Sequence, residues 1–285
     1  MIRYAKPTNV EATLALLGEE PWRILAGGTD FYPALGNRPL SENVLDINGL
    51  TELRGISETA THIVIGARTT WTDVIRHDLP AAFDGLKLAA REVGSIQIQN
   101  MASVAGNLCN ASPAADGVPP LLTLDAEVEI RSAGASRFMP LDRFILGNRR
   151  TALLPSELMT AIHIPKSSAA GSSSFCKLGA RRYLVISIAM AAARIVVANG
   201  FVEQAAVAVG SCSAVARRLA GIEAALRGVA VSELADAIAS APIDELAPID
   251  DVRASANYRR EAAREIVTRA VMAAADPTAN IPVAA

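Results

Sequence analysis

The chain has 285 residues, of which 51% are hydrophobic and 20% charged, and its formal net charge is −2. This composition is typical of a globular protein, and the length is sufficient for two domains. The balanced charge argues against a nucleic acid or an anionic membrane as a partner. We find no signal peptide and no run of about 18 apolar residues that could span a bilayer, so no membrane insertion is expected.

The residue types that most often ligate metals are isolated from one another. Three cysteines and three histidines are scattered through the sequence: Cys109, Cys176, Cys212, His62, His77 and His163. Their spacing argues against a disulfide framework and against zinc or iron–sulfur ligation in this chain. It also argues against a Ser-His-Asp site. A reducing, cytoplasmic location is the expectation.

Strands and helices are predicted to alternate through the first 80 residues, an α/β pattern. The first helix is expected to begin after Thr8, with Glu11 as the reciprocal partner of this cap, and to end at Gly18. Further strands and helices are predicted at Trp22–Ala26, Val44–Ile47, Ile63–Ile65, Thr69–Arg76 and Ala81–Val93.

The next stretch is predicted to be rich in strands. Prolines limit regular helix to the end of Ala111–Leu124, and strands are expected at Ala126–Arg131, Arg137–Met139 and Ser156–Ile164. Ser167–Ser174 is small and polar, typical of a linker or mobile loop. We therefore predict two domains, 1–170 (subdomains about 1–55 and 56–170) and 171–285.

The second domain is predicted to be a small antiparallel sheet with helices, so that the whole chain is α+β. Asn199-Gly200 between two apolar runs, Ile188–Ala198 and Phe201–Val209, is a strong hairpin signal. Helices are expected at Ala216–Arg227, Ser232–Ala239 and Asp250–Ala275. The Arg-Arg pairs at 149–150, 181–182, 217–218 and 259–260 are interpreted as solvated faces.

Two segments, both predicted to be loops, pair glycine with a short hydroxyl side chain. They are Ala26-Gly27-Gly28-Thr29-Asp30 and Ser103-Val104-Ala105-Gly106-Asn107. Glycine lets backbone N–H groups approach a ligand, and a hydroxyl adds a donor, which together suit a phosphate or pyrophosphate. Each segment alone is equally compatible with a tight turn that binds nothing. Neither is a Walker loop or a full G-x-G-x-x-G.

The two segments belong to an ordered series that spans Tyr4 to Ala275. Between and after them come Leu45-Asp46-Ile47, Ile65-Gly66-Ala67, Ser112-Pro113-Ala114-Ala115-Asp116, Phe175-Cys176-Lys177-Leu178 and Asp251-Val252-Arg253. The series resembles the FAD-binding medium subunit of the molybdenum hydroxylases, the family of xanthine dehydrogenase and carbon monoxide dehydrogenase flavoproteins. The resemblance implies a two-subdomain α/β FAD-binding domain of vanillyl-alcohol oxidase type, followed by an α+β C-terminal domain.

The resemblance also implies which residues hold FAD. The first segment would wrap the pyrophosphate and the second would grip the cofactor from the facing subdomain. Asp116 would contact FAD, Lys177 would lie near the flavin, and Val93 and Leu158 would line the isoalloxazine. The full implied set is Ala26, Gly27, Gly28, Thr29, Asp30, Phe31, Val93, Ser103, Val104, Ala105, Gly106, Asn107, Asp116, Leu158 and Lys177.

Other roles are open for several of these residues. Asp116 could cap a helix, Lys177 could be a surface charge, and Val93 and Leu158 could be core residues. Ala105 stands where the family usually has glycine. If its φ is positive, the alanine methyl would cost about 1–2 kcal/mol.

The implied function is that of an FAD-carrying oxidoreductase subunit in a heterohexameric molybdenum hydroxylase. A large partner would carry molybdopterin and a small partner [2Fe–2S] clusters. Electrons from the clusters would pass through FAD to an external acceptor such as NAD⁺, oxygen or a quinone-linked carrier. No side chain needs to act as an acid or base. Two alternatives are a self-sufficient flavin oxidase, for which Cys109 is the candidate covalent link, and an FAD-less assembly or binding module.

Overall fold

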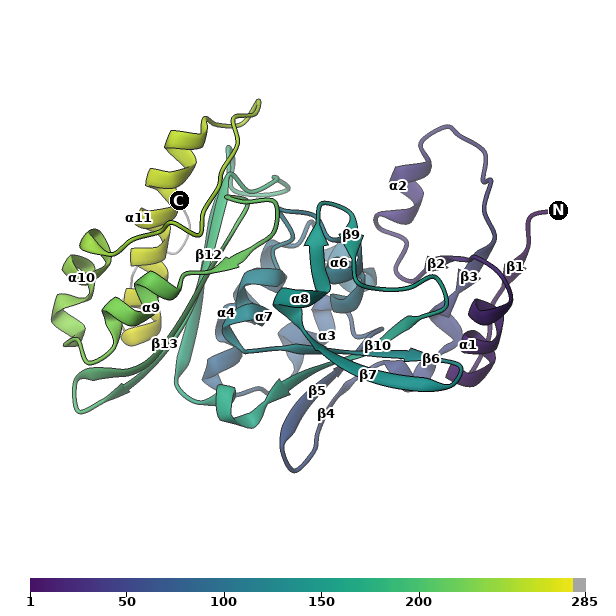
Figure 1. Ribbon diagram of the computed structural model, residues 1–285, viewed down its shortest axis with the longest axis horizontal. Helices are drawn as coiled ribbons and strands as arrows, with labels where there is room; N and C mark the ends of the chain where they lie inside the picture. The colour runs from purple at the N-terminus through teal and green to yellow at the C-terminus, as the bar shows by residue number, and fades with distance from the viewer. Residues whose placement is uncertain (279–285) are drawn as a thin grey trace.

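The computed structural model describes residues 1–278, and residues 279–285 of the predicted second domain lie outside the described part. Three layered units follow one another along the long axis of the molecule (Figure 1). Each is built on its own sheet, of three, five and four strands in chain order, and a two-stranded sheet accompanies the middle one. The α+β class and the antiparallel C-terminal sheet with helices are confirmed.

The first unit is a parallel sheet in the order β1-β3-β2 with two helices. Its elements are β1 (Tyr4–Ala5), α1 (Val10–Glu19), β2 (Arg23–Leu25), α2 (Phe31–Leu35) and β3 (Val44–Asp46). The predicted cap of α1 is wrong by one residue, because the Asn9 side chain, not that of Thr8, accepts from the Ala12 N–H at 2.8 Å. Glu11 pairs instead with Arg131. The helix continues past Gly18 to Glu19.

The second unit is an antiparallel sheet in the order β4-β5-β10-β6-β7. Its strands are β4 (Ile56–Glu58), β5 (His62–Gly66), β6 (Glu127–Ser132), β7 (Ala135–Pro140) and β10 (Leu158–Pro165), with β8 (Ile145–Gly147) and β9 (Arg150–Thr151) beside them. The α/β alternation therefore gives parallel strands only before about residue 54. The turn at residues 59–61 is too short for the crossover that parallel strands need.

Six short helices pack with this second sheet. They are α3 (Trp71–Arg76), α4 (Asp84–Glu92), α5 (Ile96–Met101), α6 (Val104–Asn110), α7 (Val118–Thr123) and α8 (Leu141–Phe144). A single hydrophobic core joins the first and second units, since Leu45 of β3, Ile65 of β5 and Trp71 of α3 belong to one buried cluster. This shared core fixes the two glycine-containing segments relative to each other.

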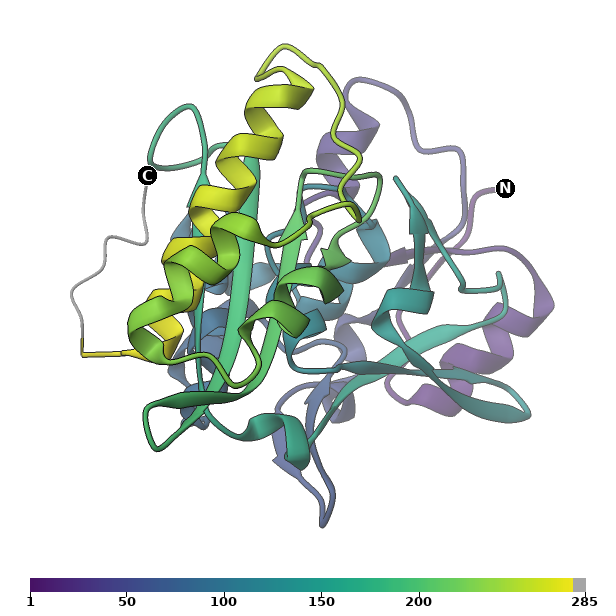
Figure 2. The same cartoon turned by 60° about the vertical axis from the view of Figure 1, so that its left-hand side comes forward.

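The third unit is an antiparallel sheet in the order β11-β12-β13-β14, with helices on one face (Figure 2). Its elements are β11 (Ser172–Leu178), β12 (Ala189–Ala198), β13 (Phe201–Gly210), β14 (Arg217–Arg218), α9 (Ala220–Leu226), α10 (Leu234–Ser240) and α11 (Ala256–Ala275). The predicted hairpin is confirmed, because Asn199 and Gly200 form the turn between β12 and β13.

Two expectations for this unit are wrong. Ser167–Ser174 is not a free loop: β11 begins at Ser172, and the buried Ser173 hydroxyl accepts from the Gly85 N–H and donates to the Ala82 carbonyl. Small serines here let β11 pack closely on α4. Arg259 is not on a solvated face but is 3% exposed, because its guanidinium donates to the Ile188 and Ser211 carbonyls and pairs with Asp251.

Within residues 1–278 no helix is long and apolar enough to cross a membrane. The same residues contain no group of three or more His, Cys, Asp or Glu side chains arranged to hold a metal ion.

Candidate functional site

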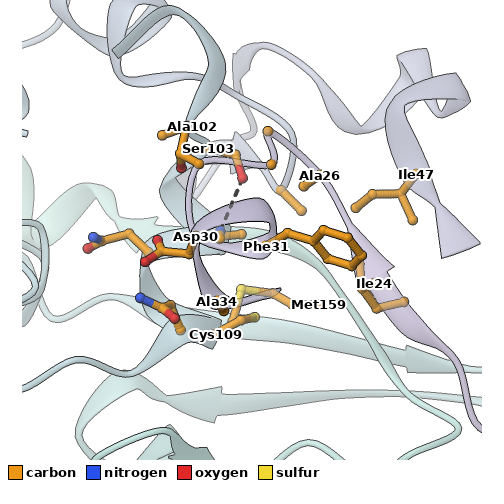
Figure 3. A pocket seen from close by; sticks show the side chains of 18 of the residues that line it. Ile24, Ala26, Asp30, Phe31, Ala34, Ile47, Ala102, Ser103, Cys109 and Met159 are labelled. Atoms are coloured by element: carbon orange, nitrogen blue, oxygen red, sulfur yellow. Dashed lines mark hydrogen bonds between the residues drawn. The ribbon is translucent and has the colours of Figure 1, made fainter. Parts of the chain in front are cut away.

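A cavity of about 710 Å³ lies between the first and second units. Its size is within the range of roughly 300–1,000 Å³ that small-molecule sites occupy. Figure 3 shows the side chains of the first unit and of the helices of the second converging on it. Most of its lining residues come from β2, the segment 26–31, the region 93–110 and the strand β10 with its approach, 149–159, and Ala34, Ile47, Ala67 and Trp71 complete the lining.

The first glycine segment forms one wall of this cavity directly after β2. Gly28 has φ +76°, a conformation that L side chains avoid, and a Cβ there would come within 2.7 Å of the Tyr32 ring. Gly27 is required by close approach, since a Cβ added to it would overlap the carbonyl oxygen of Met101. Gly27 therefore packs against the backbone of Met101 and Ala102, the two residues that directly precede the second segment.

The backbone donors of the first segment are uncommitted. No described residue accepts a hydrogen bond from the N–H groups of Gly27, Gly28, Thr29, Asp30 or Phe31, all of which line the cavity. The Ala26 carbonyl, by contrast, accepts from the Asn48 amide at 2.7 Å. Five consecutive backbone N–H groups without an acceptor, in a segment that lines a cavity, suit the binding of an anion.

The second segment is the first turn of a helix rather than a loop. Ser103 is the N-cap of α6, and its hydroxyl oxygen accepts from the Gly106 N–H at 3.1 Å (Figure 3). The Val104 and Asn107 N–H groups bond the Thr69 and Ser103 carbonyls. Ala105 lies inside this helix with a negative φ, so its methyl group imposes no backbone strain. The N–H groups of Ser103 and Ala105 are the two donors of this segment without a partner among the described residues.

All but three of the residues that the resemblance implies line the cavity. Val104 does not, because its side chain is fully buried in the core shared by the first two units. Asp116 and Lys177 do not line it either.

Asp116 and Lys177 instead form a buried ion pair. Lys177 Nζ lies 2.8 Å from Asp116 Oδ2, and the Ser187 hydroxyl donates to Asp116 Oδ1 at 3.0 Å. The two side chains are only 7% and 10% exposed. Burial raises the pKa of the Asp116 carboxyl, while Lys177 and Ser187 oppose that rise. Lys177 also donates to the Glu92 carbonyl at 3.5 Å, directly before the cavity-lining Val93.

Sequence reasoning missed several lining residues. Arg23 and Arg149 bring positive charge to the cavity, and the Arg23 guanidinium lies 4.5 Å from the centre of the Phe31 ring. Met159 and Cys109 contribute sulfur-bearing side chains (Figure 3). In the sequence Arg149 stands out only as half of an Arg-Arg pair. Its φ of +56° and the hydrogen bond from its N–H to the Ala111 carbonyl place it at the cavity, and no local sequence signal indicates either feature.

The lining also offers unpartnered polar atoms. Trp71 Nε1 and Asn107 Oδ1 are buried without a hydrogen-bond partner among the described residues, and both residues line the cavity. Buried polar atoms in native proteins are usually paired. Free N–H groups and two arginines fit a diphosphate, and the apolar Val93, Ile98 and Leu158 fit an aromatic ring. The residues present thus fit FAD.

Two family models together match most of this chain. Residues 1–167 match the family described as the FAD binding domain in molybdopterin dehydrogenase, and residues 174–274 match the CO dehydrogenase flavoprotein C-terminal domain. The putative xanthine dehydrogenase FAD-binding subunit XdhB of Escherichia coli is 31% identical over 95% of this chain and 96% of its own length. The nicotinate dehydrogenase FAD-subunit of Eubacterium barkeri is 37% identical over 64% of each chain.

The carbon monoxide dehydrogenase medium chain of Hydrogenophaga pseudoflava is 29% identical over 95% of this chain and 96% of its own. A solved structure of carbon monoxide dehydrogenase from the same organism superposes with a TM-score of 0.85 at 30% identity, covering 96% of both chains. The chain therefore belongs to the family of FAD-binding subunits of the molybdopterin dehydrogenases, which are oxidoreductases.

Proposed function

We propose that the 710 Å³ cavity binds FAD and that the chain relays electrons from the [2Fe–2S] clusters of a small partner subunit to an external acceptor. The observation that carries this proposal is the row of free backbone N–H groups from Gly27 to Phe31 on the cavity wall. When bound, FAD supplies the redox chemistry, and the protein supplies position, charge and access.

The first segment is assigned the cofactor's diphosphate. Its N–H groups would donate to phosphate oxygens, and the Thr29 hydroxyl would add a side-chain donor. Arg23 and Arg149, which also line the cavity, would balance the negative charge. In the second segment only Ser103 and Ala105 keep a free N–H, so this side offers fewer backbone donors than the first and contributes mainly shape and close contact.

The apolar part of the lining is assigned the flavin ring. Val93, Ile98 and Leu158 would exclude water from it. Because Lys177 meets Asp116 and the Glu92 carbonyl rather than the cavity, we assign Lys177 and Asp116 a positioning role. Together they would hold the Glu92–Gly94 turn, whose last two residues line the cavity.

The partners are assigned from the family and the names of its members. Relatives are called a medium chain or an FAD-binding subunit, which supports a large molybdopterin-binding partner and a small [2Fe–2S] partner. The external acceptor, whether NAD⁺, oxygen or a quinone-linked carrier, is the third participant. A cytoplasmic location remains our prediction.

Titration of the purified full chain with FAD, followed by flavin fluorescence and absorption, tests the proposal. We expect saturable binding of one FAD per chain, and no oxidation of organic donors until the partner subunits are added. A protein that takes up no FAD would favour the assembly-module alternative. Turnover of an organic donor by the chain alone would favour a self-sufficient oxidase.

A pair of threonine variants tests where the diphosphate lies. Thr29→Val keeps the side-chain shape but removes the hydroxyl, and we expect FAD affinity to fall roughly threefold to tenfold, the worth of one hydrogen bond. Thr51→Val is the matched control, because Thr51 is exposed and does not line the cavity. Equal FAD affinity in both variants would show that Thr29 does not contact the cofactor.

A further inference from the structure

A second, smaller cavity adjoins the proposed FAD site and has a different chemistry. Its volume is about 80 Å³, enough for a few waters or one small anion. It shares Ala26, Gly27 and Ser103 with the large cavity. Six further residues complete its lining: Asn48, Arg54, Arg68, Thr70, Asn100 and Met101. No carboxylate is among these lining residues of the described chain.

Two arginines face this small cavity, and each keeps a donor free. Arg54 uses Nε and Nη2 to hold the Asp73 carboxylate at 2.9 and 3.0 Å, which leaves Nη1 uncommitted. Arg68 donates to the Leu50 carbonyl at 2.9 Å and to Asn48 Oδ1 at 3.3 Å, which leaves Nε uncommitted.

Arg68 has no ion-pair partner among residues 1–278. No carboxylate oxygen of the described chain lies within 4.0 Å of its guanidinium, although the more distant Asp46 favours its charge. The side chain is half-buried, and burial together with the positive charge of Arg54 lowers the pKa of Arg68. A half-buried guanidinium that lies near another guanidinium and has no carboxylate partner is stabilised when an anion binds beside it.

The neutral side chains of the lining are also left as donors. The Thr70 and Ser103 oxygens already accept from the Asp73 and Gly106 N–H groups, so their hydroxyl hydrogens remain available. Asn100 Oδ1 accepts from the Thr72 hydroxyl at 2.6 Å, which leaves the Asn100 amide nitrogen free to donate. The acceptor of Asn48 is taken by Arg68. Uncommitted side-chain donors therefore remain on Arg54, Arg68, Thr70, Ser103 and Asn100, all of which line this cavity.

We propose that the small cavity is a binding site for a tetrahedral oxyanion of the phosphate or sulfate class, separate from the FAD diphosphate. Arg68 and Arg54 would supply charge-assisted hydrogen bonds, and Thr70, Ser103 and Asn100 would satisfy the remaining oxygens. Because Gly27 and Ser103 line both cavities, a bound anion would hold the two glycine-containing segments together from the side away from the cofactor's flavin contacts.

The test uses inorganic phosphate as the probe, on the full chain with and without FAD, by isothermal titration against chloride at equal ionic strength. We expect saturable binding of one phosphate to the FAD-loaded chain, whereas in the FAD-free chain the backbone donors of residues 27–31 are also open to a second phosphate. Arg68→Met should weaken phosphate binding at least tenfold, since a hydrogen bond to a charged group is worth about 1.5–3 kcal/mol. The matched control is Arg76→Met, which removes an exposed arginine that does not line the cavity and should leave phosphate affinity unchanged.

A second variant keeps the proposal testable if Arg68→Met fails to fold. Asn100→Asp preserves the acceptor for Thr72 but places a negative charge at the cavity, so it should abolish phosphate binding while the protein stays folded by circular dichroism. Phosphate affinity equal to wild type in Arg68→Met or Asn100→Asp would overturn the proposal. An FAD-loaded chain that binds no phosphate would also overturn it, because the anion would then bind only in the cofactor's own site.

Discussion

Two polar regions of this molecule lie close to each other and behave in opposite ways. Along the cavity wall, the N–H groups of residues 27–31 have no partner within the described chain. Outside the cavity lining, the Asp116 carboxylate pairs with Lys177 and accepts a hydrogen bond from Ser187 in a buried cluster. The family resemblance implies FAD contacts in both regions, through residues 27–31 and through Asp116 and Lys177. The difference teaches that uncommitted donors indicate where a ligand binds, whereas committed ones indicate what holds the wall in place.

The largest effect on unfolding free energy is expected from breaking the buried Asp116–Lys177 ion pair. Lys177→Met leaves the Asp116 carboxyl buried without its cation, and removal of one partner from a buried ion pair typically costs about 3–5 kcal/mol. Urea denaturation should show a loss of unfolding free energy of this size. The double variant Asp116→Leu with Lys177→Met should recover much of it, because no uncompensated charge remains.

The same variant separates the two roles of Lys177. If the lysine acts on the flavin directly, as the resemblance implies, Lys177→Met would change the reduction potential of bound FAD while leaving the unfolding free energy near that of wild type. A stable variant with a shifted potential would therefore contradict the positioning role.

Cys109 lines the cavity and is a neutral thiol. Burial raises the pKa of the Cys109 thiol from 9.0 to about 12. Since the thiolate is the reactive form, alkylation of native Cys109 at pH 8 should be roughly a thousandfold slower than for an unperturbed thiol. Its rate should still rise about tenfold per pH unit between pH 8 and 10, because the pH stays below the raised pKa.

Mass spectrometry of iodoacetamide adducts measures this rate residue by residue. The buried Cys176 and Cys212, with pKa values raised to about 11, serve as internal references in the same sample. Rapid modification of folded Cys109 that levels off near pH 9 would mean an activated thiol. That result would revive Cys109 as a covalent link to flavin in a self-sufficient oxidase.

A substitution within residues 27–31 should lower FAD affinity more than it lowers the stability of the fold. In Gly27→Ala, the new methyl group would overlap the Met101 carbonyl and push the first segment away from Met101 and Ala102. We expect FAD affinity to fall at least tenfold, with a loss of about 1–3 kcal/mol in unfolding free energy from overpacking. Fluorescence titration and urea denaturation measure the two quantities.

Gly18→Ala is the matched control for this glycine substitution. A Cβ at Gly18 meets nothing within 4 Å, and the residue lies in α1. The change should raise stability by about 0.4–1 kcal/mol and leave FAD affinity unchanged. Unaltered FAD affinity in Gly27→Ala would show that the contact of Gly27 with Met101 does not shape the cofactor site.

Local sequence predicted the elements whose signals are local. The Asn199-Gly200 hairpin and the strands near Val44 and Ile63 follow from turn chemistry and apolar runs, and all three are present. The pairing of Asp116 with Lys177 could not be predicted, because 61 residues separate them and only the packing of β11 on the second unit brings them together.

The second glycine-containing segment was misread although a signal was available. Composition indicates a loop, but Ser103 followed by Val104 and Leu108 one helical turn apart is the pattern of an N-cap and a buried helix face. Glycine at position 106 masked that pattern. The cap at Asn9 was missed for a similar reason, since Thr8 and Asn9 are both good capping residues.

The smallest effect is expected when Ala105 is replaced by the glycine that the family usually has. Ala105→Gly removes a helix-favouring methyl from α6 at a position with negative φ, so it should lower the unfolding free energy by about 0.5–1 kcal/mol. FAD affinity should not improve, because no backbone strain exists for glycine to relieve. Tighter FAD binding in this variant would instead mean that the alanine methyl crowds the cofactor from the cavity wall. The contrast between the two segments would then be one of shape rather than of free donors.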